Sequence, residues 1–523
     1  MNRDQMLHKL KKRQDKIWDV LVIGGGATGL GTALDATTRG FKTLLLEQSD
    51  FAKGTSSRST KLVHGGVRYL AQGDISLVIE ALHERGLLMQ NAPHLVKNQK
   101  FIIPNYTWWS GPFFTLGMKV YDMMSGKLGL GSSEKISKEE TLKAIPNLDE
   151  KDLIGGVIYY DGQFDDSRLA INLAQTIIEN DGVALNHFKV TNLLKDDDGL
   201  ICGVVAKDME SGETIKIKSK CVINATGVFV DDILKMNDPK AKNIIRPSQG
   251  VHLILDKSFL DSEAAIMIPK TSDGRVLFAV PWHNKVILGT TDTPLDEHSL
   301  EPRALDDEID FILNTAAQYL KKDPTKNDVL SVFAGLRPLA APEDSEGKET
   351  KEISRNHKLI VSLSGLVTIT GGKWTTYRKM AEDTIDKAIL IAGLDFKKCV
   401  TKNMPIHGYV KQVDYSDHMY IYGSDRIKLL KLINENSELA EKLHDNLPFV
   451  KGEVLWAVRH EMARTVEDVL ARRVRALFLD ARASIAMAND VAIIMAKELG
   501  YDKQWINQQV TLYTTLAKSY LLV

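Results

Sequence analysis

One stretch, residues 19–47 (DVLVIGGGATGLGTALDATTRGFKTLLLE), limits the possible folds of this chain more than any other. Its parts are, in order, a β-branched run at 19–23, the glycines Gly24, Gly26 and Gly29, a helical run to residue 39, and an apolar run at 43–46 followed by Glu47. Strand, glycine turn, helix and strand in this order predict a βαβ unit of a doubly wound parallel sheet. The sequence therefore predicts an α/β protein.

The spacing of the glycines and Glu47 predicts a dinucleotide site. Gly24 permits the tight turn after the strand, Gly26 lets a pyrophosphate approach the backbone, and Gly29 lets the helix pack closely. The helix N-terminus offers free N–H groups to the phosphates, and Glu47 suits a ribose hydroxyl. A purely structural turn does not account for these residues together. The motif does not distinguish FAD from NAD.

Composition excludes several function classes. The charges, Lys+Arg 67 and Asp+Glu 68, sum to −1, so no overall field attracts nucleic acid. Three cysteines with no CxxC pair argue against a disulfide framework or a zinc site, and we predict no bound metal. The sequence contains no run of 18 apolar residues, so we expect no transmembrane helix. A length of 523 residues exceeds one core and predicts two or three domains.

Residues 1–18 interleave apolar and basic side chains, and two interpretations stay open. Met6, Leu7 and Leu10 alternate with a cluster of lysines. A basic amphipathic helix of this kind can lie on an anionic membrane surface. It can also pack its apolar side on the rest of the protein. The segment has no secretory cleavage pattern, and we expect a cytoplasmic location.

A second glycine cradle, far along the chain, predicts that the dinucleotide is FAD. Residues 222–227 (VINATG) form a buried strand pattern that ends in a small-residue turn, and residues 370–377 (TGGKWTTY) place Gly371 and Gly372 at a helix start. The N–H groups of such a start point at a ligand. An NAD domain has no evident use for a second cradle, whereas the longer FAD can reach both. A coincidental helix cap at the glycine pair is the alternative.

Periodicity predicts the remaining elements more coarsely. Helical spacing occurs at 75–91, at 305–321 and beyond residue 400, and strand patterns occur at 185–223, 244–293 and 358–363. Residues 100–160 look irregular, while 156–175 reads as a strand, an acidic loop and then a helix. Residues 51–72 are polar, contain glycine and follow the βαβ unit directly. We expect this loop to fold over the cofactor.

The motifs together resemble a known family, the FAD-dependent glycerol-3-phosphate dehydrogenases, which pass electrons to a quinone. The matching motifs include TSSRSTKLVHGGVRYL (55–70), INATGVFVDD (223–232), PSQGVHLIL (247–255), FAGLRPL (333–339) and GGKWTTYRKMAE (371–382). HGGxRYL, AGxRPL and GGKxTTYR are specific in combination. The resemblance covers nearly the whole chain in order, with looser spacing at 105–155 and 410–450.

The resemblance implies three parts. They are a Rossmann-like FAD-binding domain of the glutathione-reductase and D-amino-acid-oxidase type (1–100, 160–235 and 330–398), an antiparallel-sheet substrate domain (101–159 and 236–329) and a helical C-terminal domain (399–523). It also implies a set of contacts with non-covalent FAD, namely Gly24, Gly26, Ala27, Thr28, Gly29, Glu47, Thr55, Ser56, Ser57, Lys61, Leu62, His64, Gly65, Gly66, Val190, Ala225, Thr226, Gly227, Gly372, Lys373, Trp374 and Thr375.

The family's substrate, sn-glycerol 3-phosphate, needs cations for its phosphate and a group that takes the proton of its C2 hydroxyl. The resemblance places Arg68, Tyr69 and Arg355 around the substrate. Arg337 and Lys373 are expected near the C2 oxygen and the flavin, where positive charge stabilises developing negative charge. Each arginine alone would more often be a surface ion pair. Their shared place in the family motifs favours the substrate.

We predict His252 as the base, with His64 as the alternative. His252 lies in an apolar strand pattern, VHLIL, and taken alone it reads as a core histidine. His64 precedes a glycine pair in the cofactor loop and can instead hydrogen-bond the flavin. The sequence does not decide between them.

The electron acceptor and the surroundings of the protein follow from the resemblance. Oxidases of the family carry an insertion before the C-terminal helices, and none is evident between 295 and 400. This favours a membrane quinone over oxygen. We also expect peripheral association with the inner (cytoplasmic) membrane and a homodimer. The alternatives are a glycerol-3-phosphate oxidase, a related FAD amine or amino-acid oxidase, and a flavin-binding sensor without turnover.

Overall fold

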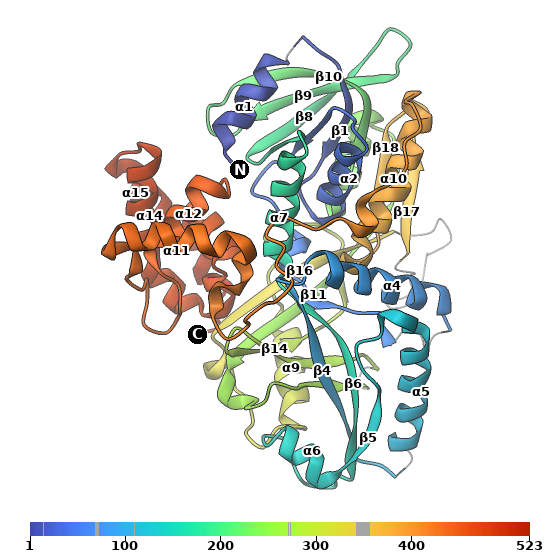
Figure 1. Ribbon diagram of the computed structural model, residues 1–523, viewed down its shortest axis with the longest axis vertical. Helices are drawn as coiled ribbons and strands as arrows, with labels where there is room; N and C mark the ends of the chain where they lie inside the picture. Colours follow the sequence, from blue (N-terminus) through green and yellow to red (C-terminus); the bar gives the residue numbers. More distant parts are fainter. Residues whose placement is uncertain (14, 68–72, 109, 270, 272–273, 341–355) are drawn as a thin grey trace.

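The protein consists of two sheets, one above the other, with a group of helices at one side (Figure 1). The structure is a computed structural model that describes residues 1–523 except 14, 68–72, 109, 270, 272–273 and 341–355. The first sheet lies at the top of Figure 1, the second below it, and the C-terminal helices on the left. No described helix is long and apolar enough to cross a membrane.

The first sheet contains the predicted βαβ unit. Its central strand order is β17-β18-β10-β1-β2-β7, and β8 and β9 extend it through the long strand β10. The strands are β1 (Trp18–Ile23), β2 (Thr43–Leu46), β7 (Val183–Leu185), β8 (Phe188–Lys195), β9 (Ile201–Asp208), β10 (Thr214–Asn224), β17 (His357–Val361) and β18 (Val367–Gly371). From β18 to β7 the pairing is parallel. The carboxyl ends of these strands therefore share one edge, where ligands bind in such sheets.

Three helices pack beside the first sheet, α2 (Ala27–Thr38), α7 (Asp166–Glu179) and α10 (Tyr377–Ala392). The first and last follow the two predicted glycine cradles. Burial of the whole strand β2 explains its continuous apolar sequence, because both sides of a parallel sheet are covered. A short helix, α8 (Val230–Asn237), follows the VINATG turn.

The second sheet has the order β15-β11-β14-β13-β12-β4-β6-β3, with β16 on β11 and β5 on β6. Its strands are β3 (Leu62–Val63), β4 (Val96–Asn105), β5 (Glu134–Ser137), β6 (Gly155–Phe164), β11 (Ile245–Asp256), β12 (Ala265–Ile268), β13 (Leu277–Trp282), β14 (Lys285–Gly289), β15 (Thr293–Pro294) and β16 (Ser331–Ala340). Four helices contact this sheet: α4 (Ile75–Asn91), α5 (Ser110–Ser125), α6 (Lys138–Ala144) and α9 (Asp306–Ala317).

Residues 100–160 are not irregular: β4, α5, β5 and α6 lie there, and β4 was missed because its mixed polar and apolar residues show no simple alternation. The strand and helix expected at 156–175 are confirmed as β6 and α7. The division into domains stays a prediction. We note that β16, within the range expected for the FAD-binding part, pairs with β11 of the second sheet.

The C-terminal part is helical, as expected. Its helices are α11 (Arg426–Glu435), α12 (Lys451–His460), α13 (Ala476–Leu479), α14 (Ala481–Leu499) and α15 (Lys503–Lys518), with a π-helix at Asp468–Arg473. They share an apolar core with Ile254, Trp282 and Phe333 of the second sheet. Arg473 and Arg472 also reach buried Asp50, at 2.8 and 2.6 Å. The helices are thus attached to both sheets.

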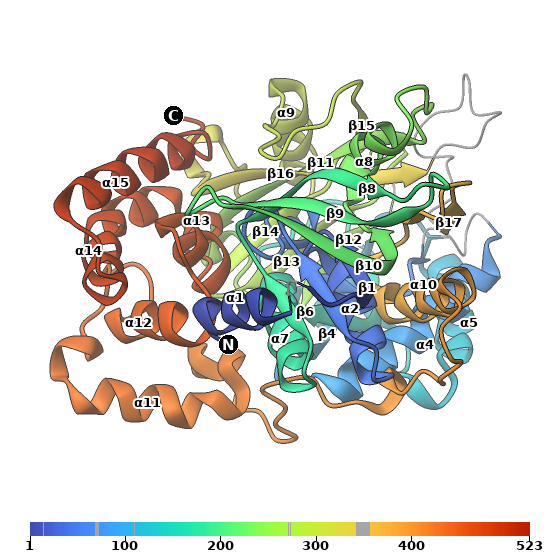
Figure 2. The same ribbon diagram turned by 90° about the horizontal axis from the view of Figure 1, so that it is seen from above.

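The N-terminal helix, α1 (Arg3–Lys12), packs on the protein. Its apolar residues Met6 and Leu10 belong to the main core, and Arg3 Nη2 lies 2.7 Å from Asp208 Oδ1. Figure 2 shows α1 between the first sheet and the C-terminal helices. Of the two interpretations of this segment, the packed helix is confirmed, because its apolar side is already buried.

Candidate active site

The first cavity, of about 270 Å³, opens at the carboxyl edge of β1 and β10. The residues predicted to hold a dinucleotide that line it are Gly24, Gly26, Ala27, Thr28, Glu47, Thr55, Ser56, Val190, Ala225, Thr226 and Gly227. Gly24 adopts φ +108°, and a Cβ there would lie 2.7 Å from the oxygen of Ala225. The bare backbone therefore allows the strand ends of β1 and β10 to meet at the cavity.

Hydrogen bonds hold the edges of the first cavity. The partly buried Glu47 carboxylate accepts from the N–H groups of Gly25 (2.7 Å) and Ser49 (2.8 Å). Burial raises its pKa. Ser56 Oγ accepts from the Ala27 N–H at 2.9 Å, which ties the 51–72 loop to the start of α2.

The second cavity, of about 280 Å³, lies between the two sheets and continues from the first. The residues that line both cavities are Thr55, Pro338, Gly371, Gly372, Lys373 and Trp374. The Trp374 indole donates to the Ser56 carbonyl at 2.8 Å, and the His64 N–H donates to Thr375 Oγ1 at 3.3 Å. The two glycine cradles therefore border one elongated space, which fits an extended dinucleotide such as FAD.

His252 and Arg337 reach the second cavity from neighbouring strands. Glycines on the adjacent strands make room for both side chains. A Cβ at Gly289 would lie 2.4 Å from His252 Cδ2, and a Cβ at Gly250 would lie 2.5 Å from Arg337 Nη2. Packing thus explains Gly250, in the motif at 247–255, and Gly289 on β14.

The imidazole of His252 is buried and oriented. Its Nε2 and Thr60 Oγ1 are joined by a hydrogen bond of 2.9 Å, and its ring stacks on Phe333 with centroids 4.9 Å apart. Nδ1 has no hydrogen-bond partner among the described residues. Burial, and then the charges of Lys61 and Arg337, hold the pKa of His252 well below its usual value. The ring is therefore neutral near pH 7.

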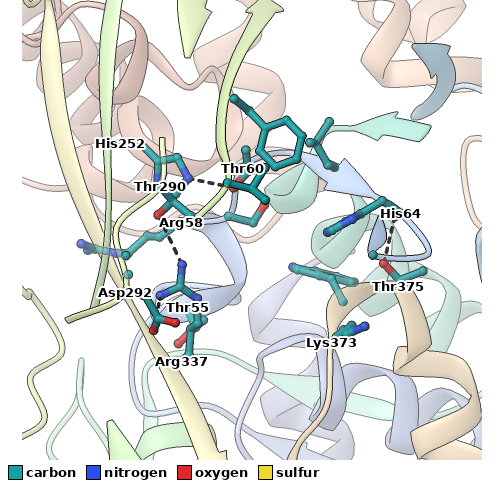
Figure 3. Close-up of a pocket in the computed structure, with 18 of the residues that line it drawn as sticks. Thr55, Arg58, Thr60, His64, His252, Thr290, Asp292, Arg337, Lys373 and Thr375 are labelled. Carbon is teal, nitrogen blue, oxygen red and sulfur yellow. Dashed lines mark hydrogen bonds and ion pairs between the residues drawn. The ribbon is translucent and has the colours of Figure 1, made fainter. Parts of the chain in front are cut away.

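Polar groups surround Arg337 on the same side of the cavity. Its Nη2 donates to the Thr291 carbonyl (3.0 Å) and Thr290 Oγ1 (3.3 Å), and its Nη1 lies 3.4 Å from Asp292. Figure 3 shows this group and His252 on one side, and His64, Thr375 and Lys373 on the other. The space between them could hold a flat ring and a small polyol.

Comparison with known proteins identifies the family. A profile described as FAD dependent oxidoreductase matches residues 19–378, and one described as the C-terminal domain of alpha-glycerophosphate oxidase matches residues 367–506. The chain is 42% identical to the probable mitochondrial glycerol-3-phosphate dehydrogenase of Caenorhabditis elegans, over 95% of this chain and 73% of that protein. The human mitochondrial enzyme is 39% identical over 93% and 71% of the two chains. This chain belongs to the FAD-dependent glycerol-3-phosphate dehydrogenase family.

Solved structures agree with this membership of the dehydrogenase family. The glycerol-3-phosphate dehydrogenase of Bacillus halodurans, solved with FAD, matches with a TM-score of 0.80 at 32% identity, over 99% of this chain and 97% of that one. Glycine oxidase of Geobacillus kaustophilus shares the fold, with a TM-score of 0.53 at 17% identity. The predicted fold class and the FAD cofactor are confirmed.

The structure places most residues that the dehydrogenase motifs suggested at the two cavities. Leu62, His64, Gly66, Trp374 and Thr375 line the second cavity together with His252, Arg337 and Lys373. Arg68, Tyr69 and Arg355 lie outside the described residues.

Four residues of the predicted cofactor set line neither cavity: Gly29, Ser57, Lys61 and Gly65. Gly29 packs against the turn at Gly24, and Gly65 packs against Leu82 and Tyr121. Lys61 is buried with Asp166. The sequence motifs place these residues in segments that form the cofactor site, but they do not show which side chains face the ligand.

Sequence reasoning missed other residues that line the second cavity. They include Arg58, Thr60, Arg275, Thr290, Thr291 and Asp292, beside an apolar wall of Val67, Phe101, Tyr159, Met267 and Phe278. Thr60 lies within the motif at 55–70, in the polar loop that was expected to cover the cofactor. That position was the signal that could have identified it as a residue of the site. Arg275 had no signal, because a single arginine before a strand is common.

Proposed function

We propose that this protein oxidises sn-glycerol 3-phosphate to dihydroxyacetone phosphate, with FAD as the resident cofactor. The observation that carries the proposal is the meeting of His252, Arg337 and Lys373 at one cavity that continues from the FAD-binding edge of the first sheet. Membership of the glycerol-3-phosphate dehydrogenase family supports the choice of substrate.

Substrate binding requires cations, because the phosphate is a dianion. We propose that Arg68 and Arg355 bind the phosphate with Tyr69, as the family resemblance implies. Arg337 and Lys373 then lie nearer the C2 oxygen. A guanidinium held by fixed acceptors, as Arg337 is, stays oriented without reorganisation during the reaction.

In the proposed mechanism, His252 takes the proton of the C2 hydroxyl. FAD, when bound, supplies the acceptor of the C2 hydride at its N5 atom. The neutral imidazole can accept a proton, and the charge of the bound phosphate dianion raises its affinity for that proton. Thr60 and Phe333 orient the ring, and Arg337 stabilises the oxygen as its proton leaves. The C2–O bond becomes a carbonyl. His64, on the opposite side, remains the alternative base.

A quinone is the proposed electron acceptor. The absence of an evident insertion between 295 and 400 in the sequence supports a dehydrogenase over an oxidase that uses oxygen. A related amine or amino-acid oxidase would bind a carboxylate and would not need the phosphate-binding arginines.

The test is anaerobic reduction of the purified holoenzyme. Glycerol 3-phosphate is expected to bleach the absorbance of bound flavin, and a quinone analogue is expected to restore it faster than oxygen does. Glycine is the control substrate and leaves the absorbance unchanged. Bleaching by glycine but not by glycerol 3-phosphate would identify an amino-acid oxidase, and no bleaching by either would indicate a binding protein.

Peripheral association with the membrane follows from a quinone acceptor, and we propose the outer side of α5 as the contact. Phe113, Leu116 and Met123 lie on one side of this helix and are 64–74% exposed, and Trp108 before it is 83% exposed. Its inner side supports the cofactor loop, where Tyr121 Oη accepts from the Gly65 N–H at 2.7 Å. The bilayer is the proposed occupant because its lipids hold the quinone.

Location and assembly remain proposals. We place the protein at the cytoplasmic face of the inner membrane, whereas several relatives are named mitochondrial. The C-terminal helices are the proposed site of homodimer formation.

A further inference from the structure

A buried lysine, Lys61, contacts the ring of Phe333, on which the proposed base His252 stacks. The Lys61 side chain is fully buried, with Nζ 2.6 Å from Asp166 Oδ2 and 2.7 Å from the Ser57 carbonyl. The centroids of three rings lie 5.2–5.5 Å from Nζ, those of Trp282, Phe333 and Phe478. Charge pairing and cation–π contacts therefore hold this ammonium in one place.

The lysine and its partner reach His252 by two routes. Asp166 Oδ2 accepts from the Ser59 N–H and hydroxyl, at 3.2 and 2.7 Å. Asp166 thus anchors both chain neighbours of Thr60, whose hydroxyl is hydrogen-bonded to His252. The second route is Phe333, which stacks on His252 and also contacts the Lys61 ammonium.

The C-terminal helices complete this arrangement. Arg475, which precedes α13, is buried, and its Nη2 lies 3.2 Å from Asp166 Oδ1 and 3.0 Å from the Ser57 carbonyl. It adopts φ +64°, and its guanidinium carbon lies 5.4 Å from the centroid of the Trp282 ring on β13. Asp166 is therefore shared between Lys61 of the cofactor loop and Arg475 of the C-terminal part.

We propose that Lys61, Asp166 and Arg475 are positioning residues that set the orientation and protonation of His252. This rests on the proposed function, in which His252 takes the substrate proton. The charged groups that act on His252 are Lys61 and Arg337, and both oppose its protonation. Asp166 and Asp165 act on Lys61 in favour of its ammonium, and Arg475 acts against it. Burial is stronger and lowers the pKa of Lys61 to about 7.

The expected effect of Lys61→Met on the pH profile has a definite sign. Loss of the ammonium raises the pKa of His252, so the acid limb of kcat/KM for glycerol 3-phosphate moves up by roughly one pH unit. Turnover falls roughly ten- to hundredfold, because Thr60 and the ring lose their fixed geometry. KM changes little, since no substrate contact is removed. Arg475→Met is expected to lower turnover in the same way and to a smaller extent.

Arg473→Met is the matched control. Arg473 is equally buried on the adjacent turn but pairs with Asp50, not with Asp166. It is expected to lower the melting temperature while the acid limb stays in place. A second control combines Lys61→Met with His252→Asn, whose turnover should be no lower than that of His252→Asn alone.

Each outcome decides one question. Wild-type flavin that glycerol 3-phosphate does not reduce would refute the proposed function itself. A reducible wild type, together with Lys61→Met and Arg475→Met holoenzymes that keep their turnover and acid limb, would refute the positioning role alone. If Lys61→Met fails to retain FAD, Arg475→Met decides, because an effect on turnover equal to that of Arg473→Met would mean a structural role.

Discussion

At the scale of single residues, the glycines determine how closely backbone and ligand approach. Gly29 lies inside α2, and a Cβ there would lie 1.9 Å from the oxygen of Gly24. No backbone can tolerate that distance, so either the helix or the turn must shift. The residue therefore acts on FAD indirectly, by holding the N-terminus of α2 against the turn after β1.

Gly29→Ala is accordingly expected to weaken FAD binding at least about tenfold, which corresponds to the cost of one overpacked methyl group. Titration of the apoprotein, followed by flavin fluorescence, measures the change. Gly117→Ala is the control, because a Cβ at that helical glycine meets no atom within 4 Å. Equal affinities of the two variants would contradict this account of the glycine motif.

At the scale of elements, one histidine joins α7 to the segment before α11. His407 Nδ1 lies 2.6 Å from Glu179 Oε1, and Nε2 lies 2.7 Å from Asp425 Oδ2. Despite burial, which acts in the opposite direction, these carboxylates raise the pKa of His407 to about 9. Both ring nitrogens then donate, and the imidazolium bridges two elements that are far apart in the sequence.

The pH dependence of this bridge can be tested with His407→Gln. Because the folded-state pKa is raised above its unfolded value near 6.5, the stabilisation is complete below that pH and is lost as the pH rises to about 9. The full shift corresponds to about 3 kcal/mol, and solvent screening at the half-exposed Glu179 reduces it. Melting temperatures of wild type and variant should differ most near pH 6 and converge near pH 9. His8→Gln on α1 is the control, and a difference that grows with pH would contradict the assignment.

At the scale of the whole molecule, the cavities lie where the two sheets meet, and α5, which carries the exposed apolar residues Phe113 and Leu116, packs against α4 at the right of Figure 1. Replacing both Phe113 and Leu116 with serine is expected to reduce flotation of the protein with vesicles that contain one anionic lipid and one neutral lipid. Leu390→Ser, at a leucine on α10 that is 75% exposed, is the control. Flotation of the double variant at the wild-type level would place the membrane contact elsewhere.

The sequence predicted much of the first sheet and less of the second. Local features determine the βαβ unit, since the glycines after β1 and the spacing of α2 act within about thirty residues. The strand β6 was predicted from its run of apolar residues, but its partner β4 was not, because β4 is stabilised by pairing with β6 and by the apolar side of the cavity, not by a local pattern. The N-terminal helix was predicted, but only packing of Met6 and Leu10 decided between membrane and protein as its partner.

By itself, the sequence determined the FAD cofactor, the fold class and the family, because these depend on short motifs whose backbone geometry is local. Only the tertiary structure decided which side chains meet. Thr60 and His252 are separated by 192 residues, and the register of β11 against β14 and β16 brings the histidine between Gly289 and Phe333. The structure likewise shows that Lys61, which was expected at the cofactor, is buried and paired with Asp166. Such contacts depend on the pairing of distant strands, which no single segment encodes.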